Sequence, residues 1–421
     1  MKTPFFSGFR AHLARTRCTP NPAHSALMIA LGILGLGTCV AMAGQRIQST
    51  DLTYLGTINI THNDANCAGS PNARSTGLTF NPSGNGGAGS FYITGRNATH
   101  CVAEITKPAV GGTATFIQNY ADPTNGTADK IGDCYNGCFI GGHLIYNGNL
   151  YVSAFSYYDA AFTATRSLWR HSLTLANHSG MVGPVAAGPG NQGTYNQYMD
   201  NVPTEFQAML GGPAVIGGCC FSIITRTSLG PALYAFDPER PGTVTGLVGY
   251  PDGHQTLNSW GASGSHPEAN PTTKMGGVSF VEGTDTVLFV GTTGKGSYCY
   301  GGSECNDPQY PDTKGAHAYP YVHYMWAYDV NDLAAVKAGT KQMWDVLPYA
   351  HWELSSLGSA GDEWSTLGVA FDPTAKLLYV LKNREGNGSA WPQLHVYKVN
   401  VTGTSVAPTA PLTPTGLKIV P

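Results

Sequence analysis

The sequence predicts an all-β fold in which about five small antiparallel sheets, each of about four strands, form a ring. Three observations support this prediction. The composition is rich in glycine and poor in charge, one strand-turn-strand pattern recurs along the chain, and a further strand pattern precedes the first repeat without a hairpin partner of its own.

The composition excludes several other classes of protein. Glycine supplies 54 of the 421 residues, which argues against a coiled coil or a helical bundle because glycine destabilises helix interiors. Aromatic residues make up 10% of the chain, enough for a large core, so intrinsic disorder is excluded as well. The net charge of −3 argues against nucleic acid as a main partner, since phosphate binding needs a basic surface.

The first 43 residues have the pattern of an export signal. Residues 1–25 carry four basic side chains and no acid, an apolar run follows over residues 26–40, and Ala41-Met-Ala43 supplies the small residues that a signal peptidase reads. We therefore expect a signal peptide over residues 1–43 and a secreted or periplasmic protein. Two alternatives stay open at this point, namely a retained membrane span and a lipid anchor at Cys39.

If the protein is exported, we expect its cysteines to form disulfides, because an even number of cysteines in an oxidising compartment indicates disulfides. Proximity favours Cys134–Cys138 and Cys299–Cys305, and a zinc site at the first pair is disfavoured because no second ligand pair follows at finger spacing. The adjacent Cys219 and Cys220 form a bond that distorts their peptide, pair elsewhere, or stay as buried small apolar residues. The cysteines that remain after signal removal are Cys67, Cys101, Cys134, Cys138, Cys219, Cys220, Cys299 and Cys305.

Each repeat begins with a small residue and continues as an apolar strand, a tight polar turn and a second apolar strand, which is a hairpin signal. We predict such hairpins over residues 77–95, 142–153, 212–224, 277–291 and 368–380. A third strand follows each, at residues 102–105, 168–171, 233–236, 325–328 and 394–397. A fourth is expected around Thr115, Val182, Val244 and Met343 in the first four repeats.

The last repeat lacks a fourth strand, and the strand pattern at residues 52–59 lacks a sheet. Pairing the two would close a ring of blades and remove its exposed edges, as in a β-propeller. We therefore predict a β-propeller over residues 44–402 with about five four-stranded blades, six or seven being possible, and a Pro/Thr-rich tail over residues 403–421.

Two stretches carry a resemblance to a known group of proteins. Gly368-Val-Ala-Phe-Asp-Pro, followed by Leu377-Leu-Tyr-Val380, is similar to a generic propeller blade. The segment from Gly315 to Leu333 resembles a family of secreted bacterial β-propeller proteins without an assigned activity. The resemblance implies an exported propeller and assigns no catalytic residue.

In a four-stranded meander, the connections from strand two to strand three emerge on the same face as those from one blade to the next. Here these connections are the long ones, and long loops on one end of a rigid scaffold are where binding residues concentrate. We expect the blade-to-blade connections at residues 61–76, 119–140, 188–210, 251–275 and 356–366, and the others at 94–100, 154–167, 225–231, 291–323 and 382–391.

These loops supply the candidate ligand-binding residues. Cations recur just after strand two in four blades, and the remaining blade has tyrosines there; Tyr298 and Tyr319 belong to the longest, tyrosine-rich loop. Arginine binds carboxylate or sulfate groups, and aromatic faces stack on sugar rings. Alternatively, the cations pair with acids of neighbouring blades, and the tyrosines form a small core of the loop. The candidates are Arg96, Arg226, Lys295, Arg384, Tyr157, Tyr158, Tyr298 and Tyr319.

The sequence lacks the common hydrolase, phosphate-binding and calcium-binding motifs, and no metal or cofactor is predicted. We interpret the chain as an exported protein that binds a glycan or another envelope or extracellular ligand through its long loops. The alternative is a carbohydrate-active hydrolase or lyase on the same scaffold, with Glu205 and Glu363 near the central mouth as candidate catalytic acids.

Overall fold

A computed structural model describes the protein at residues 44–61, 75–94, 100–134, 137–187, 196–219, 222, 225–251, 269–360, 365–382 and 392–401. The chain divides into two units, residues 1–42 and 43–421, and every described residue belongs to the second. Among the described residues, no helix has the length and apolarity needed to cross a membrane.

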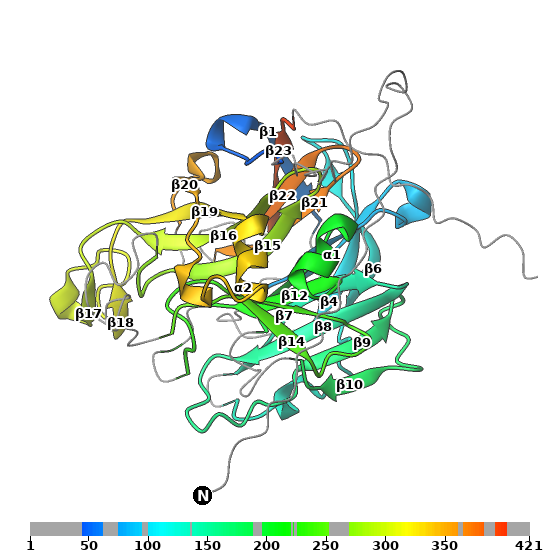
Figure 1. Ribbon diagram of the computed structural model, residues 1–421, viewed down its shortest axis with the longest axis horizontal. Coiled ribbons are helices and arrows are strands. Elements are labelled where there is room, and N and C mark those ends of the chain that lie inside the picture. Colours follow the sequence, from blue (N-terminus) through cyan, green and yellow to red (C-terminus); the bar gives the residue numbers. More distant parts are fainter. Residues whose placement is uncertain are drawn as a thin grey trace, which may run out of the picture. The chain divides into compact units, whose positions relative to one another are not determined.

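The described residues of the second unit include five blades that follow one another along the chain, each built on a meander of four strands (Figure 1). Blade 1 consists of β2 (Leu78–Asn81), β3 (Ser90–Thr94), β4 (Val102–Thr106) and β6 (Phe116–Ala121). Blade 2 consists of β7 (Cys138–Tyr146), β8 (Asn149–Ser156), β9 (Leu168–Ser172) and β10 (Val182–Val185). Blade 3 consists of β11 (Tyr198–Asn201), β12 (Ala214–Gly218), β13 (Ala232–Phe236) and β14 (Val244–Val248).

Blade 4 consists of β15 (Lys274–Val281), β16 (Thr286–Gly294), β19 (Tyr321–Asp329) and β20 (Ala350–Glu353). Blade 5 consists of β21 (Thr366–Asp372), β22 (Leu377–Lys382), β23 (Gln393–Val399) and β1 (Leu52–Ile60). The first strand of every blade contacts the first strands of the two neighbouring blades, so these five strands surround the axis of a propeller.

Strand β1 closes the ring as the sequence predicts. It pairs antiparallel with β23 from Leu52, opposite Val399, to Asn59, opposite Gln393, with a bulge at Leu55. A second clasp comes from blade 1, whose short strand β5 (Thr113–Ala114) pairs parallel with the end of β1. The closure thus joins blade 5 to blade 1 through main-chain hydrogen bonds and leaves fewer exposed edges.

The small residue that begins each repeat has a packing role. A Cβ added to Gly142 would lie 2.4 Å from the backbone nitrogen of Met199 in the next blade, and one added to Gly277 would lie 2.7 Å from the backbone nitrogen of Val369. Cβ atoms essentially never come this close to other atoms. Glycine therefore allows the inner strands to approach one another around the axis.

Two expectations about individual strands were wrong. Residues 212–224 do not form a hairpin, because β12 is one strand that pairs with both β11 and β13. The glycines at its end suggested a turn, but a Cβ on Gly217 would lie 1.9 Å from the Ala232 carbonyl oxygen, so close packing of two strands requires this glycine. Met343 lies in a 3-10 turn against β14, and the fourth strand of blade 4 is β20.

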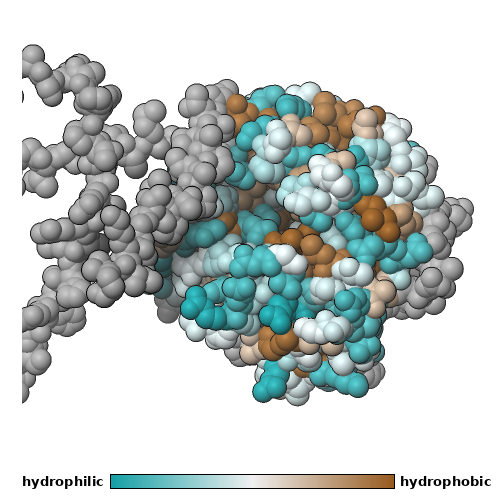
Figure 2. Space-filling model, turned by 90° about the vertical axis from the view of Figure 1, so that its right-hand side faces the viewer, coloured by the Kyte–Doolittle hydropathy of each residue, from teal (hydrophilic) through white to brown (hydrophobic). Residues whose placement is uncertain are grey.

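The face opposite the long loops carries two helices that the sequence analysis did not predict. Helix α1 (Thr204–Leu210) connects β11 to β12, and α2 (Val330–Lys337) connects β19 to β20. The two helices contact each other, and we call this side the helix face (Figure 1). Figure 2 views the right-hand side of Figure 1, where hydrophobic residues form small separate groups among hydrophilic ones.

Candidate functional site

The long-loop face is the side that bears the connections from strand two to strand three and from each blade to the next. Its described parts include residues 157–167, 225–231 and 295–320, and the connections around residues 122–134 and 354–360. In blade 3 the boundaries differ from the expected ones. The connection into that blade ends before β11 at Tyr198, and its loop from strand two to strand three begins after Gly218.

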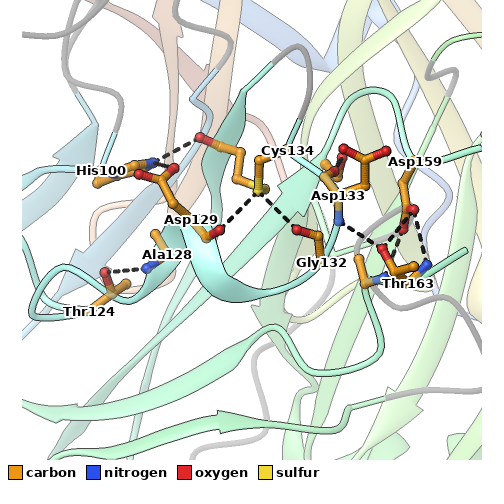
Figure 3. The surroundings of a disulfide bond; sticks show 12 residues. His100, Thr124, Ala128, Asp129, Gly132, Asp133, Cys134, Asp159 and Thr163 are labelled. Atoms are coloured by element: carbon orange, nitrogen blue, oxygen red, sulfur yellow. Dashed lines mark hydrogen bonds and ion pairs between the residues drawn. A yellow bond between two sulfur atoms is a disulfide. The ribbon is translucent and has the colours of Figure 1, made fainter. Parts of the chain in front are cut away.

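Disulfides brace this face, as the sequence predicts. Cys134 bonds to Cys138, the first residue of β7, and Cys299 bonds to Cys305 within the longest loop. Cys101 and Cys219 are disulfide-bonded too, whereas Cys67 and Cys220 lie outside the described residues. Beside the first disulfide, His100 Nε2 lies 2.9 Å from the Cys138 carbonyl oxygen and 3.1 Å from Asp129 Oδ1 (Figure 3).

The loop between β8 and β9 is held rigid by one buried carboxylate. Asp159 accepts hydrogen bonds from the backbone nitrogens of Thr163 and Ala164 at 3.0 and 2.8 Å, and from the Thr163 hydroxyl at 3.0 Å (Figure 3). Its own backbone N–H donates to the hydroxyl of Thr225 in blade 3 at 2.9 Å. The loop is thereby tied to a loop of the neighbouring blade.

This rigid loop displays Phe162, which the sequence analysis missed. Its side chain is 49% exposed, and its backbone is left-handed, with φ of 54°. A left-handed conformation costs an aromatic residue about 1–2 kcal/mol and persists only where the surroundings impose it. Backbone strain combined with an exposed ring is typical of a binding residue, and neither property can be read from the sequence.

The longest loop lies between β16 and β19 and contains a small core. Asp307 Oδ2 lies 2.9 Å from His317 Nδ1 and accepts a hydrogen bond from the Tyr321 hydroxyl at 2.6 Å. His317 Nε2 lies 2.7 Å from the Thr313 carbonyl oxygen. Because both ring nitrogens face acceptors, the geometry favours the doubly protonated form of His317. Burial alone lowers the pKa of His317, but the bonds to Asp307 and Thr313 outweigh it and raise that pKa overall.

The loop core confirms the structural role for part of the tyrosine cluster and leaves two rings at the surface. Tyr310 and Tyr321 pack edge to face within the core. Tyr300 and Tyr319 are 40% and 48% exposed. Their hairpin, β17 (Cys299–Gly301) and β18 (Gly315–His317), lies beyond the ends of β16 and β19 (Figure 1).

Of the predicted cations, Arg226 and Lys295 belong to the described residues, and Arg96 and Arg384 lie outside them. Arg226 is buried and its charge acts on Tyr298; burial raises the pKa of Tyr298, and Arg226 opposes that rise. Lys295 is exposed, and its Nζ lies 4.7 Å from the centre of the Tyr324 ring. Of these two predicted cations, Lys295 is therefore the one presented to solvent.

The other predicted residues are two tyrosines of blade 2 and the two candidate catalytic acids. Tyr157 and Tyr158 are half-buried, and Tyr157 packs against a pair of buried phenylalanines at the start of blade 2. Glu205 lies in α1 on the helix face, so the expectation that it lies near the mouth among the long loops was wrong. Glu363 lies outside the described residues. Among the residues that the structure describes, no three His, Cys, Asp or Glu side chains are grouped so that they would hold a metal ion.

A buried polar group also lies where the inner strands of blades 1 to 3 meet. His143 and the pair Asn196 and Gln197 are at most 1% exposed, and a Cβ on Gly141 would lie 3.0 Å from Gln197 Cα. Within the described residues, Asn196 Oδ1 and Gln197 Nε2 make no hydrogen bond. Burial lowers the pKa of His143 to about 4, so the ring is neutral. Sequence reasoning missed the pair because it did not identify β11.

No protein-family model and no curated protein matches this chain. Among solved structures it is similar to the glutaminyl cyclase of Myxococcus xanthus, with 12% identity and a TM-score of 0.29 over 86% of this chain and 99% of that one. It is also similar to a chain of the mitotic checkpoint complex, with 7% identity and a TM-score of 0.31 over 82% and 95%. The Dos1 propeller matches at 8% identity and a TM-score of 0.27 over 79% and 69%. The assignment of this chain as a β-propeller rests on its own strand pairing.

Proposed function

We propose that this β-propeller protein is exported and binds an extracellular carbohydrate through its long-loop face. The observation that carries the proposal is the left-handed backbone and exposed ring of Phe162 on a loop fixed by Asp159. Tyr300 and Tyr319 add two further exposed rings on the same face. Aromatic faces stack on sugar rings, and rings on rigid loops lose little entropy on binding.

The chemistry of this face favours a sugar that carries an anionic group. Lys295 is exposed at the start of the loop that bears Tyr300 and Tyr319, and it supplies a positive charge for a carboxylate or sulfate. Two disulfides on this face support export, because disulfides persist in oxidising compartments. The leader pattern at residues 1–43 agrees with this compartment.

The test is binding to a panel of neutral and acidic polysaccharides, followed by calorimetry on the best ligand. We expect Phe162→Gly and Tyr319→Ala each to weaken binding about two- to tenfold, because one stacked ring contributes about 0.5–1.5 kcal/mol. Leu347→Ala is the matched control, since Leu347 is 42% exposed on the connection that carries α2, on the helix face. Retained binding by both aromatic variants, or an equal loss in the control, would refute the proposed surface.

Phe162→Gly also separates a binding role from a structural one. Glycine adopts a φ of 54° without steric cost, so the variant should be as stable as the natural protein or more so. Loss of binding together with unchanged or higher thermal stability indicates that the strain at Phe162 serves ligand binding. A clear loss of stability would instead indicate that the ring is a structural element of the loop.

A further inference from the structure

The first described residues of the chain are docked onto blade 4 on the helix face. The backbone nitrogen of Gly44 donates to Asp285 Oδ2 at 2.6 Å, and the backbone nitrogen of Asp285 donates to the Gln45 carbonyl oxygen at 3.0 Å. Ile47 is fully buried, and its backbone nitrogen donates to the Thr286 hydroxyl at 3.0 Å. This segment leads directly into β1, the strand that closes the ring.

Two carboxylates lie near Gly44, and a side-chain cation pairs with one of them. Asn331 Nδ2 lies 3.0 Å from Asp285 Oδ2 and 3.0 Å from Asp329 Oδ1, so it bridges two carboxylates. Asp329 forms an ion pair with Arg46. In the described part of the chain, no side-chain cation pairs with Asp285. A half-buried carboxylate in this position is stabilised by a nearby positive charge.

Gly44 also packs tightly against the Asp285 side chain. A Cβ at this position would lie 2.4 Å from Asp285 Oδ1 and 2.7 Å from its Cγ, so any other side chain would displace the carboxylate. The residues immediately before it are Ala41-Met-Ala43, which place small side chains where a signal peptidase requires them. Two independent features therefore meet at the peptide bond between Ala43 and Gly44.

We propose that the chain is cleaved between Ala43 and Gly44, and that Asp285 is a binding site for the new α-ammonium group of Gly44. Water adds across the peptide bond, which leaves a carboxylate on Ala43 and an ammonium on Gly44. The ammonium forms a charge-assisted hydrogen bond with Asp285, beside the Arg46–Asp329 pair. Because this charge exists only after removal of the leader, processing strengthens the anchor of the ring-closing strand after export.

The cleavage itself is tested by expressing the chain with its own leader and determining the N-terminus of the exported protein by intact mass and N-terminal sequencing. The expected first residue is Gly44. A retained leader, a start at another residue or a lipid on Cys39 would each overturn the proposal, because in none of these products does Gly44 carry an ammonium group.

The charge pairing is tested with a second protein that retains Ala43 and so keeps the Gly44 N–H but moves the ammonium away. We expect the protein that retains Ala43 to have an unfolding equilibrium constant at pH 6.5 that is about three- to tenfold larger than that of the protein starting at Gly44. This factor is the range for a partly exposed charge-assisted hydrogen bond. Asp285→Asn should abolish this difference, which a double-mutant cycle measures. Asp312→Asn, at an exposed acid in the longest loop, should leave it unchanged.

The pH dependence provides a readout that a structural role of Asp285 would not give. An α-amino group has an ordinary pKa of about 7.7–8.0. The Asp285 carboxylate favours the charged form, so the stabilisation is present below that range and is lost as the pH rises above it. Arg46, Asp329 and Asn331 also face the site. Equal stability of the two N-terminal forms at pH 6.5 would overturn the pairing.

Discussion

The Asp307–His317 pair gives the sharpest prediction for this protein. Its side chains are 1% and 4% exposed, and it lies in the core of the loop that carries Tyr300 and Tyr319. Replacing His317 with glutamine removes the positive charge and leaves Asp307 buried without its cation. Tyr321 and the backbone nitrogens of Gln309 and Tyr310 still donate to the carboxylate, at 2.6, 2.8 and 3.2 Å.

The expected cost follows from those contacts. Removing one partner of a buried ion pair costs about 3–5 kcal/mol. Since three hydrogen bonds to Asp307 remain, we expect the lower end, about 3 kcal/mol of local stability. The blades do not depend on this pair, so the loss should appear as opening of residues 299–317 rather than as global unfolding.

The sign of the pH dependence follows from the two pKa shifts. The pKa of His317 is raised, so its contribution is fully present below its unfolded pKa of about 6.5 and is lost as the pH rises through the raised value. Burial alone raises the pKa of Asp307, but the bonds from Tyr321 and His317 outweigh it and lower that pKa overall. The contribution of Asp307 is therefore present above about pH 3.9 and is lost as the pH falls through the lowered value.

Hydrogen exchange read by mass spectrometry measures the opening of the loop directly. After correction for intrinsic exchange rates, the exchange of residues 299–317 in the natural protein gives the equilibrium constant for opening of the loop. We expect this constant to be about ten times larger, or more, at pH 9 than at pH 6, because one charge-assisted bond is lost. His317→Gln should open easily at both pH values. His351→Gln, at an exposed histidine of the same blade, is the control. A loop that opens equally at both pH values in the natural protein would refute the doubly protonated His317.

Three further predictions concern the scaffold. Ile58→Ala changes a buried position of β1 and should destabilise the protein by about 2–5 kcal/mol in chemical denaturation. Leu55→Ala, at the exposed bulge of the same strand, should change the stability by less than about 0.5 kcal/mol. Equal effects of the two substitutions would contradict ring closure by β1. Gly217→Ala should lower the melting temperature markedly, because the added Cβ would lie 1.9 Å from the Ala232 carbonyl oxygen. Gly242→Ala should leave the melting temperature unchanged, because no atom lies within 4 Å of the added Cβ. We expect Cys219 to be bonded to the adjacent Cys220, which non-reducing peptide mapping detects as a single peptide 2 Da lighter than its reduced form; alkylation of Cys220 without reduction would exclude this.

The repeat architecture could be predicted because every blade encodes its own hairpin. In blade 5, Gly368-Val-Ala-Phe-Asp-Pro is followed after a short turn by Leu377-Leu-Tyr-Val380, and the observed strands β21 and β22 cover these residues. Blade 3 was misread because its first strand has four residues and is separated from the second by α1. A short strand followed by an inserted helix has no local pattern that distinguishes it from a loop.

The binding face was predicted less completely than the fold. The sequence indicated which loops are long and that Cys134–Cys138 and Cys299–Cys305 brace them, and both bonds are present. It did not distinguish the buried Arg226 from the exposed Lys295, nor the buried Tyr321 from the exposed Tyr319. Within each pair the two residues have similar chemistry and stand in the same kind of connection, and they differ in which neighbours they meet.

Local alternation of apolar residues, turn chemistry and cysteine spacing thus determined the blades, their closure by residues 52–59 and two disulfides, because these features depend on residues close in sequence or on one complementary strand. Side-chain contacts that the strand pattern does not encode decided the rest. The left-handed backbone of Phe162, the charge on His317 and the fit of Gly44 against Asp285 each depend on groups that the folded chain brings within about 3 Å of one another. Such proximity is a property of tertiary structure and has no periodic signature in the sequence.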